Sequence, residues 1–338
     1  MLNVEKHVKQ VQGISADNVP QWVVESTEPL LLKGFATHWP LVQAGLQSPQ
    51  AACDYLREFY QGNPIIACYG DSGINGRVFY NDTFDGFNYQ ATRVDLNPVL
   101  DRLLAHIDDA EPPTMYVGST EVNQFLPGFK EQHQISIDEH QPLTSIWIGN
   151  RSKVAAHYDF PLNIACNVVG RRRFTLFPPE QVKNLYTGPM ELAPGGQDIS
   201  MVDFDAPDFD RFPNFAKAIE HAQVAELEPG DALFLPSMWW HHVEGLDGLN
   251  MLLTHWWRDT PAFMGRPHNA LLLAMLSLRN LPYEQRQAWK HVFSHYIFDH
   301  DEQDIAHLPE AAQGMLKTPM DELTARKIRA ELLEKLRR

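Results

Sequence analysis

The sequence predicts a mainly β protein whose core is an antiparallel sandwich or barrel. Three observations lead to this fold class. From residue 114 to residue 257, short β-prone runs alternate with turn signals. Before this stretch the patterns of helix and strand are mixed, and from residue 267 the chain reads as helical. We therefore expect a mixed α/β region at 1–110, a β core at 111–260 and a helical region at 261–338.

The N-terminal region carries the signals of three helices and one strand. The clearest helix spans 48–60, where Ser48 is a suitable N-cap, a proline follows it and apolar residues recur at helical spacing. A second helix is expected at 97–107, where the apolar residues form one stripe. The segment 29–35 reads as a strand, and residues 15–26 read as a short helix.

The β core contains one run of strands and one long interruption. The expected strands are TMYVGS, SIWIGN, LNIACNVVG, RFTLFPP, AELEPGDALFLPS, HHVEGL and NMLLTHWW. Residues 180–220 form an insertion that is rich in proline, aspartate and phenylalanine, with a helix expected in NFAKAIEHA.

The C-terminal region combines two apolar helices. Residues 269–278, NALLLAMLSL, are apolar on nearly all sides and so must be covered. The last helix is expected to begin at Thr318-Pro319 and to carry an apolar stripe that consists of Leu323, Ile328, Leu332 and Leu336. We expect these helices to form a homodimer around a twofold axis. The alternative is that they pack on the β core of their own chain.

Composition limits the class of protein. The chain has 338 residues and a formal net charge of −15, which disfavours binding to nucleic acid. No apolar run approaches the length of a membrane helix, and the N-terminus lacks the apolar segment of a signal peptide. An odd number of scattered cysteines indicates a reducing compartment, and we expect the cytoplasm; they are Cys53, Cys68 and Cys166.

A set of candidate metal ligands stands at the end of two β-prone runs. His157 and Asp159 are two residues apart, so both point to one face of an extended chain. A distant run contributes His241 and His242, which point to opposite faces, and one of these imidazoles could meet the first pair. Two histidines and one carboxylate hold Fe(II) with three positions open. The alternative is that His241 and His242 pack in the core beside Trp239 and Trp240.

Three adjacent arginines follow the first ligand pair. In an extended chain Arg172 shares a face with Phe174, while Arg171 and Arg173 share the other face. A guanidinium that points into a barrel needs an anion, and a dicarboxylate would supply one. The alternative is that all three arginines cover a sheet surface and pair with the acidic excess.

Several motifs in order resemble the JmjC/cupin-like 2-oxoglutarate oxygenases. They are HYD at 157, GRRRFTLFPPEQ, VDFDAPDFDRFPNF, EPGDALFLPSMWWHHVE and THWW, and EPLLLKGFATHWPLV resembles the N-terminal part of the family. The pattern also resembles the asparaginyl hydroxylases that act on hypoxia-inducible factor. The resemblance covers residues 114–258 well, and the motifs are specific in combination.

This resemblance implies a double-stranded β-helix, or jelly roll, and a function. Fe(II) would be held by His157, Asp159 and His241, with 2-oxoglutarate as cosubstrate and dioxygen as oxidant. Arg172 would bind the distal carboxylate of 2-oxoglutarate, and further cosubstrate contacts would come from Tyr116, Asn163 and His255. Trp239, Trp240 and Trp257 could keep water out of the site, and the alternative for each of them is packing in the core.

The implied activity is hydroxylation, with a protein side chain as the favoured substrate. Hydroxylation of a small molecule or a modified nucleotide stays open. Two other classes also stay open: a metal-binding cupin enzyme that does not use 2-oxoglutarate, for which a buried Arg172 would be unnecessary, and a binding module without turnover. The complete set of metal ligands argues against the module.

Overall fold

The computed structural model describes residues 2–137 and 140–337, and the chain divides into two compact units. The first unit extends to Arg258, and the second begins at Asp259. The N-terminal region and the β core therefore belong to one unit. No helix in the described part of the chain is long and apolar enough to cross a membrane.

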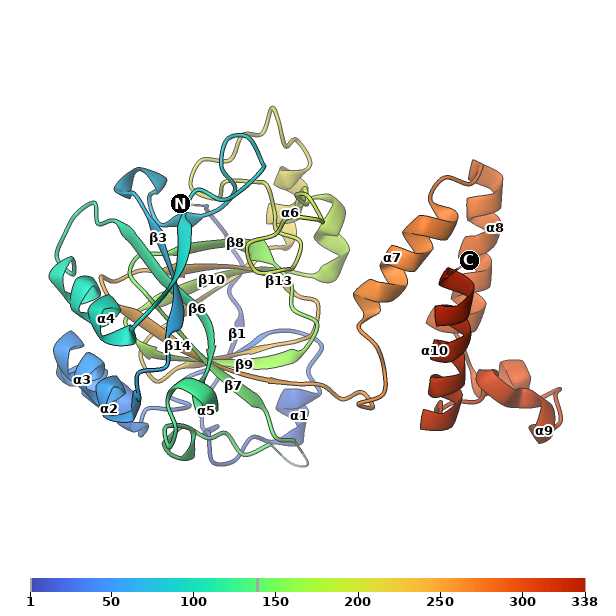
Figure 1. The fold of residues 1–338 in the computed structure, drawn as a ribbon, viewed down its shortest axis with the longest axis horizontal. Helices are drawn as coiled ribbons and strands as arrows, with labels where there is room; N and C mark the ends of the chain where they lie inside the picture. Colours follow the sequence, from blue (N-terminus) through green and yellow to red (C-terminus); the bar gives the residue numbers. More distant parts are fainter. Residues whose placement is uncertain (1, 138–139, 338) are drawn as a thin grey trace. The chain divides into compact units, whose positions relative to one another are not determined.

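Two β-sheets form the first unit and confirm the expected jelly-roll fold (Figure 1). The nine-stranded sheet has, in spatial order, β1 (Lys9–Val11), β2 (Leu30–Leu32), β12 (Ala232–Leu235), β9 (Leu162–Val169), β14 (Asn250–Trp257), β7 (Leu143–Gly149), β6 (Thr114–Glu121), β3 (Ile65–Gly70) and β5 (Gln90–Val94). The five-stranded sheet has β11 (Gln223–Leu227), β10 (Arg172–Phe177), β13 (Trp240–Gly245), β8 (Lys153–His157) and β4 (Arg77–Val78).

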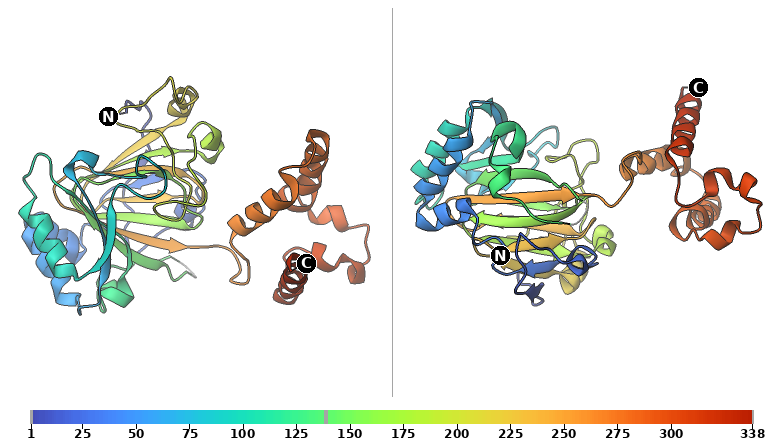
Figure 2. Two further views of the ribbon diagram at one scale, coloured as in Figure 1. Left: turned by 45° about the horizontal axis from the view of Figure 1, so that its top comes forward. Right: turned by 90° about the horizontal axis from the view of Figure 1, so that it is seen from below.

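Side chains that alternate along each strand define two faces of each sheet. Apolar residues of facing strands, such as Leu176 and Leu233, pack together between the sheets. On the other face of the nine-stranded sheet, Ile164 and Leu253 pack in the largest core cluster, which also contains apolar side chains of the helices. Figure 2 shows the helices of the first hundred residues, in blue to teal, on one side of the strands. Both faces of this sheet are therefore buried.

Six α-helices belong to the described part of the first unit: α1 (Gln21–Val24), α2 (Pro40–Gln47), α3 (Pro49–Phe59), α4 (Leu96–Ala105), α5 (Val122–Phe125) and α6 (Phe215–His221). The expected N-cap of α3 is confirmed, because the Ser48 side chain accepts a hydrogen bond from the Ala51 amide at 3.0 Å. The caps explain why α3 and α4 begin where they do, since Asp95 caps α4 in the same way.

The second unit consists of helices, chiefly α7 (Pro267–Leu278), α8 (Tyr283–Phe293), α9 (Glu310–Gln313) and α10 (Glu322–Leu336). The expected start of the last helix at Thr318-Pro319 was wrong. Asp321 caps α10 by accepting a hydrogen bond from the Thr324 amide at 2.7 Å, so the helix begins three residues later.

A buried pair of histidines lies in the helix-covered core of the first unit. The His255 Nε2 atom is 3.1 Å from the His133 carbonyl oxygen, and the Leu41 amide donates to Nε2 of His133 at 3.3 Å. The His255 ring also packs on Trp39, with ring centroids 5.7 Å apart. Burial lowers the pKa of both histidines to about 4, so the fold holds both rings neutral.

We expect these histidines to make the fold sensitive to acid. Their pKa is lower in the folded chain than in the unfolded chain, so the unfolded chain binds more protons between pH 6.5 and pH 4. The stabilisation that comes from holding these two histidines neutral is fully present above pH 6.5. Below that pH the free energy of unfolding falls by about 1.4 kcal/mol per pH unit for each such group. In thermal unfolding followed by circular dichroism, His255→Asn should show a smaller loss of Tm between pH 7 and pH 4.5 than the wild type. An equal loss would contradict this, and the exposed His38→Asn serves as control.

The homodimer expected from the C-terminal helices stays a prediction, and the second unit carries exposed apolar side chains that a partner copy would cover. Within the described residues of this unit, Ile305 is the one buried apolar side chain, whereas Leu276 and Phe298 are 77% and 74% exposed. Light scattering should therefore give twice the chain mass of 38.6 kDa, because a second copy would cover these side chains. Leu276→Asp should shift the mass towards the monomer. The control is Leu143→Asp, at an exposed leucine of the first unit. A monomeric wild type would overturn the expectation.

Candidate metal and cosubstrate site

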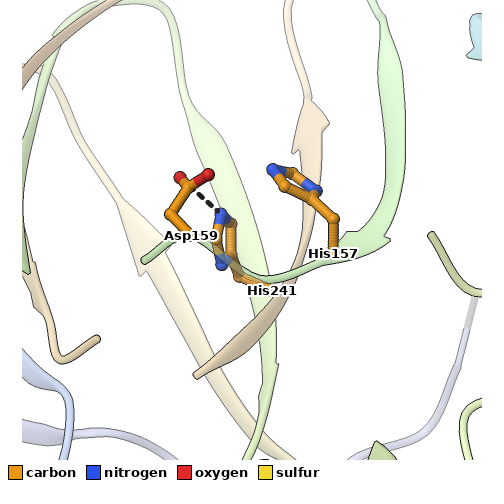
Figure 3. Close-up of side chains that lie close together, drawn as sticks. All are labelled: His157, Asp159 and His241. Atoms are coloured by element: carbon orange, nitrogen blue, oxygen red, sulfur yellow. Dashed lines mark ion pairs between the residues drawn. The ribbon is translucent and has the colours of Figure 1, made fainter. Parts of the chain in front are cut away.

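Two neighbouring strands bring the expected metal ligands together (Figure 3). His157 is the last residue of β8, and Asp159 follows it by two residues. His241 lies on β13 directly opposite His157 in the antiparallel pair. The pairing therefore joins residues that are 84 positions apart in the sequence.

The geometry of this cluster fits one divalent metal ion. Its three ligand atoms lie within 4.8 Å of one another, and Nε2 of His241 is 3.7 Å from Oδ2 of Asp159. Both histidines place Nδ1 against a backbone carbonyl oxygen, that of Ala155 at 2.9 Å and that of Trp239 at 3.0 Å. A carbonyl can only accept, so each Nδ1 donates and each Nε2 keeps its lone pair for a metal.

The protonation state of His241 also suits a metal. Burial, with a smaller effect of His157, lowers the pKa of His241 to about 4. The ring is therefore neutral at physiological pH, as a ligand must be. Two neutral imidazoles and one carboxylate are the ligand set that leaves three positions open on non-haem iron.

His242 lies on the opposite face of β13, as strand alternation predicts. Its ring packs on Phe204 at a centroid distance of 4.5 Å, and its Nε2 is 4.0 Å from Glu244. Burial lowers its pKa to about 3. His242 is therefore part of the packing outside the sandwich, and not part of the metal cluster.

The metal cluster opens into a cavity of about 760 Å³ within the first unit. Both sheets line it, and so do residues of the 180–220 insertion. Apart from the cluster, the lining is largely apolar and aromatic; it includes Ile66, Val78, Phe87, Tyr89, Phe125, Trp147 and Trp256. A mostly apolar cavity with a few polar groups is typical of a small-molecule site.

Arg172 is a buried cation in this cavity. Its guanidinium is within hydrogen-bond distance of the Asn167 side chain, with Nε 3.4 Å from Oδ1, and no carboxylate of the described residues forms an ion pair with it. Burial lowers the pKa of Arg172 to about 10, and the nearby Tyr116 partly opposes this shift. A buried cation without a counter-charge destabilises the empty site, so an anion is expected to bind there.

The three arginines lie in three different environments. The exposed Arg171 binds Asp247 through two side-chain contacts, of 2.8 Å and 3.2 Å. Arg173 points to the outer face, where it donates to the Leu2 carbonyl oxygen at 3.3 Å. The alternative that all three arginines cover a sheet surface is therefore wrong. Of the three, Arg172 alone lines the cavity.

Two of the three other expected cosubstrate residues also line the cavity. Burial raises the pKa of Tyr116, so its hydroxyl stays protonated and can donate. The Asn163 Oδ1 atom accepts from the His255 amide at 3.1 Å, which directs the NH₂ group of Asn163 towards other acceptors. His255 must be corrected, because its side chain lies in the helix-covered core and does not line the cavity.

For the three tryptophans considered from the sequence, the alternative of core packing is confirmed. Trp239, Trp240 and Trp257 each pack in a core cluster, whereas Trp147 and Trp256 line the cavity. Strand alternation could have found these two, since Trp256 shares a face with Thr254 of the lining. Gln197 was also missed: its Nε2 atom donates to Oδ1 of Asp159 at 2.7 Å. It lies in an irregular segment in which no periodic pattern marks its direction.

Three known proteins show how far the similarity extends. Lysine-specific demethylase 8 of Danio rerio is 26% identical over 265 residues, which are 76% of this chain and 60% of that protein. HSPB1-associated protein 1 of Homo sapiens is 34% identical over 153 residues, 43% of this chain and 30% of that protein. tRNA wybutosine-synthesizing protein 5 of Gallus gallus is 37% identical over 106 residues, 31% of this chain and 30% of that protein.

The family match extends further along the chain than the second and third of these similarities. The chain spans three fifths or less of the length of each of these relatives. The model of the cupin-like domain family matches residues 16–263, which include every residue of the metal cluster and the cavity. The chain therefore belongs to the family of JmjC-type cupin-like domains.

Proposed function

We propose that the protein is an Fe(II)- and 2-oxoglutarate-dependent oxygenase that hydroxylates its substrate. The observation that carries the proposal is the burial of Arg172, without a counter-charge, in the same cavity as the His157, Asp159 and His241 cluster. JmjC-type members of the family typically have this activity, which supports the proposal.

Each polar residue of the cavity has a role in this proposal. His157, Asp159 and His241 would hold Fe(II), and Arg172 would bind the distal carboxylate of 2-oxoglutarate with help from the Tyr116 hydroxyl. Asn163 would donate a hydrogen bond to the cosubstrate. When bound, iron, 2-oxoglutarate and dioxygen supply an oxidative decarboxylation that is coupled to hydroxylation of a C–H bond. The apolar lining would exclude water from this chemistry.

A cupin enzyme that binds a metal but not 2-oxoglutarate is the main alternative. Such an enzyme has no use for a cation at Arg172, and a buried cation that is not used costs stability. The alternative therefore leaves the most unusual feature of the cavity without a reason.

The lining favours an uncharged group on the prime substrate. In the described lining, Asp159 is the one carboxylate and Arg172 is the one arginine or lysine. Once iron and 2-oxoglutarate use both, a lysine ammonium or a phosphate meets no counter-charge. We propose that the substrate is an uncharged side chain of a protein, because the sequence resemblance favours a protein side chain. The name of the wybutosine-synthesizing relative supports a modified nucleotide as the alternative substrate. Stimulation of 2-oxoglutarate turnover by asparagine- and lysine-containing peptides and by nucleosides decides between these substrates.

Removal of the carboxylate of the cluster should abolish metal binding. We expect Asp159→Ala to retain no iron and to show no 2-oxoglutarate turnover, because two imidazoles alone are a weak site. Iron content after anaerobic loading and release of carbon dioxide from 2-oxoglutarate measure this. His242→Gln is the control and should retain iron, since His242 faces away from the cluster. Full turnover by Asp159→Ala would refute the site.

Removal of the buried cation should weaken binding of 2-oxoglutarate. A charge-assisted hydrogen bond in a covered site contributes about 1.5–3 kcal/mol, so Arg172→Ala should raise the Kd for 2-oxoglutarate roughly ten- to a hundredfold. Calorimetry with the Mn(II)-loaded protein measures this without turnover. Arg171→Ala and Arg173→Ala should change the Kd far less. Equal effects of the three variants would reject the role of Arg172.

A further inference from the structure

The two oxygens of Asp159 have different partners. Oδ2 lies on the side of the histidines, 3.7 Å from Nε2 of His241. Oδ1 accepts a hydrogen bond from Nε2 of Gln197 at 2.7 Å. The environment therefore distinguishes the oxygen that faces the metal position from the one that does not.

Gln197 is held in place by the strand that carries the first metal ligand. Two residues after it, Ile199 forms a β-bridge with His157, and the Ser200 amide donates to the Ala156 carbonyl oxygen at 2.7 Å. The segment before Gln197 is also anchored, since the Tyr80 hydroxyl donates to the Leu192 carbonyl oxygen at 2.7 Å. The amide of Gln197 thus reaches Asp159 from a backbone that is registered on β8.

We propose that Gln197 is a positioning residue that makes Asp159 bind the metal through Oδ2 alone. This inference rests on the metal site of the proposed function. A carboxylate can use one or both oxygens towards a metal. The hydrogen bond holds Oδ1 towards Gln197 and fixes the plane of the carboxylate, as outer partners of metal ligands do.

The number of open positions depends on this restriction. With one oxygen from Asp159 and two histidines, a six-coordinate metal keeps three positions, which suffice for a chelating 2-oxo acid and dioxygen. If Oδ1 also bound, two positions would remain, and the chelating cosubstrate would fill both. Gln197 therefore keeps one position available for dioxygen.

The number of water ligands on Mn(II) tests the inference without turnover. At saturating Mn(II) and without 2-oxoglutarate, broadening of the EPR lines in ¹⁷O-enriched water counts these ligands. We expect three waters in the wild type and two in Gln197→Leu, which has no donor. Asp198→Asn is the control: Asp198 accepts from the Tyr158 hydroxyl at 3.2 Å in the same segment but does not contact Asp159. It should keep three waters, which separates positioning from a general loosening of the segment.

The outcomes separate the two proposals. A wild type that binds no Mn(II) would overturn the proposed function. Three waters in both the wild type and Gln197→Leu, or two in the wild type, would overturn the role of Gln197 alone. Two waters in both Gln197→Leu and Asp198→Asn would also overturn the role of Gln197. Loss of a water would then follow from any substitution in the segment and not from loss of the Gln197 amide.

Discussion

The pairing of β8 with β13 is the interaction on which the site depends. It places His157 opposite His241, and strand alternation sends both imidazoles into the sandwich. The register shifts between His241 and Val243, so the strand is irregular beside the ligand. A slip of one residue would replace His241 by His242, whose surroundings suit packing against Phe204. The same sheet extends to β10, which pairs with β13 and places Arg172 in the cavity.

The buried cation shows a conflict between stability and binding in the empty protein. A paired or hydrophobic residue at position 172 would make the core more stable. The neighbouring arginines do find partners, since Arg171 binds Asp247 at the surface. The fold therefore tolerates the cost at the one arginine that faces the cavity, as proteins do at functional sites.

Most of the β core could be predicted from the sequence, because its signals are local. Alternation along each strand predicted the faces of His157 and Arg172, and an extended chain after His157 predicted the direction of Asp159. The turn residues marked the strand ends. The prediction that His255 contacts the cosubstrate was wrong for a physical reason. Both faces of the nine-stranded sheet are buried, so alternation shows which residues share a face but not which face lines the cavity. The helices that cover one face of the sheet enclose the His255 side chain, and their position cannot be read from alternation along a strand. The start of α10 failed because Thr318 and Asp321 are both good caps, and local chemistry does not choose between them.

Gln197 marks the limit of prediction from pattern. Its segment belongs to the 180–220 insertion, whose composition indicates a loop and nothing of its path. Only the bridge from Ile199 to His157 fixes that path, and a bridge of one residue pair leaves no periodic signal. Yet this bridge directs a donor to the one ligand whose binding mode can vary. Imidazoles bind through a single nitrogen, whereas a carboxylate has two oxygens, so a partner for Asp159 adds a constraint that the histidines do not need.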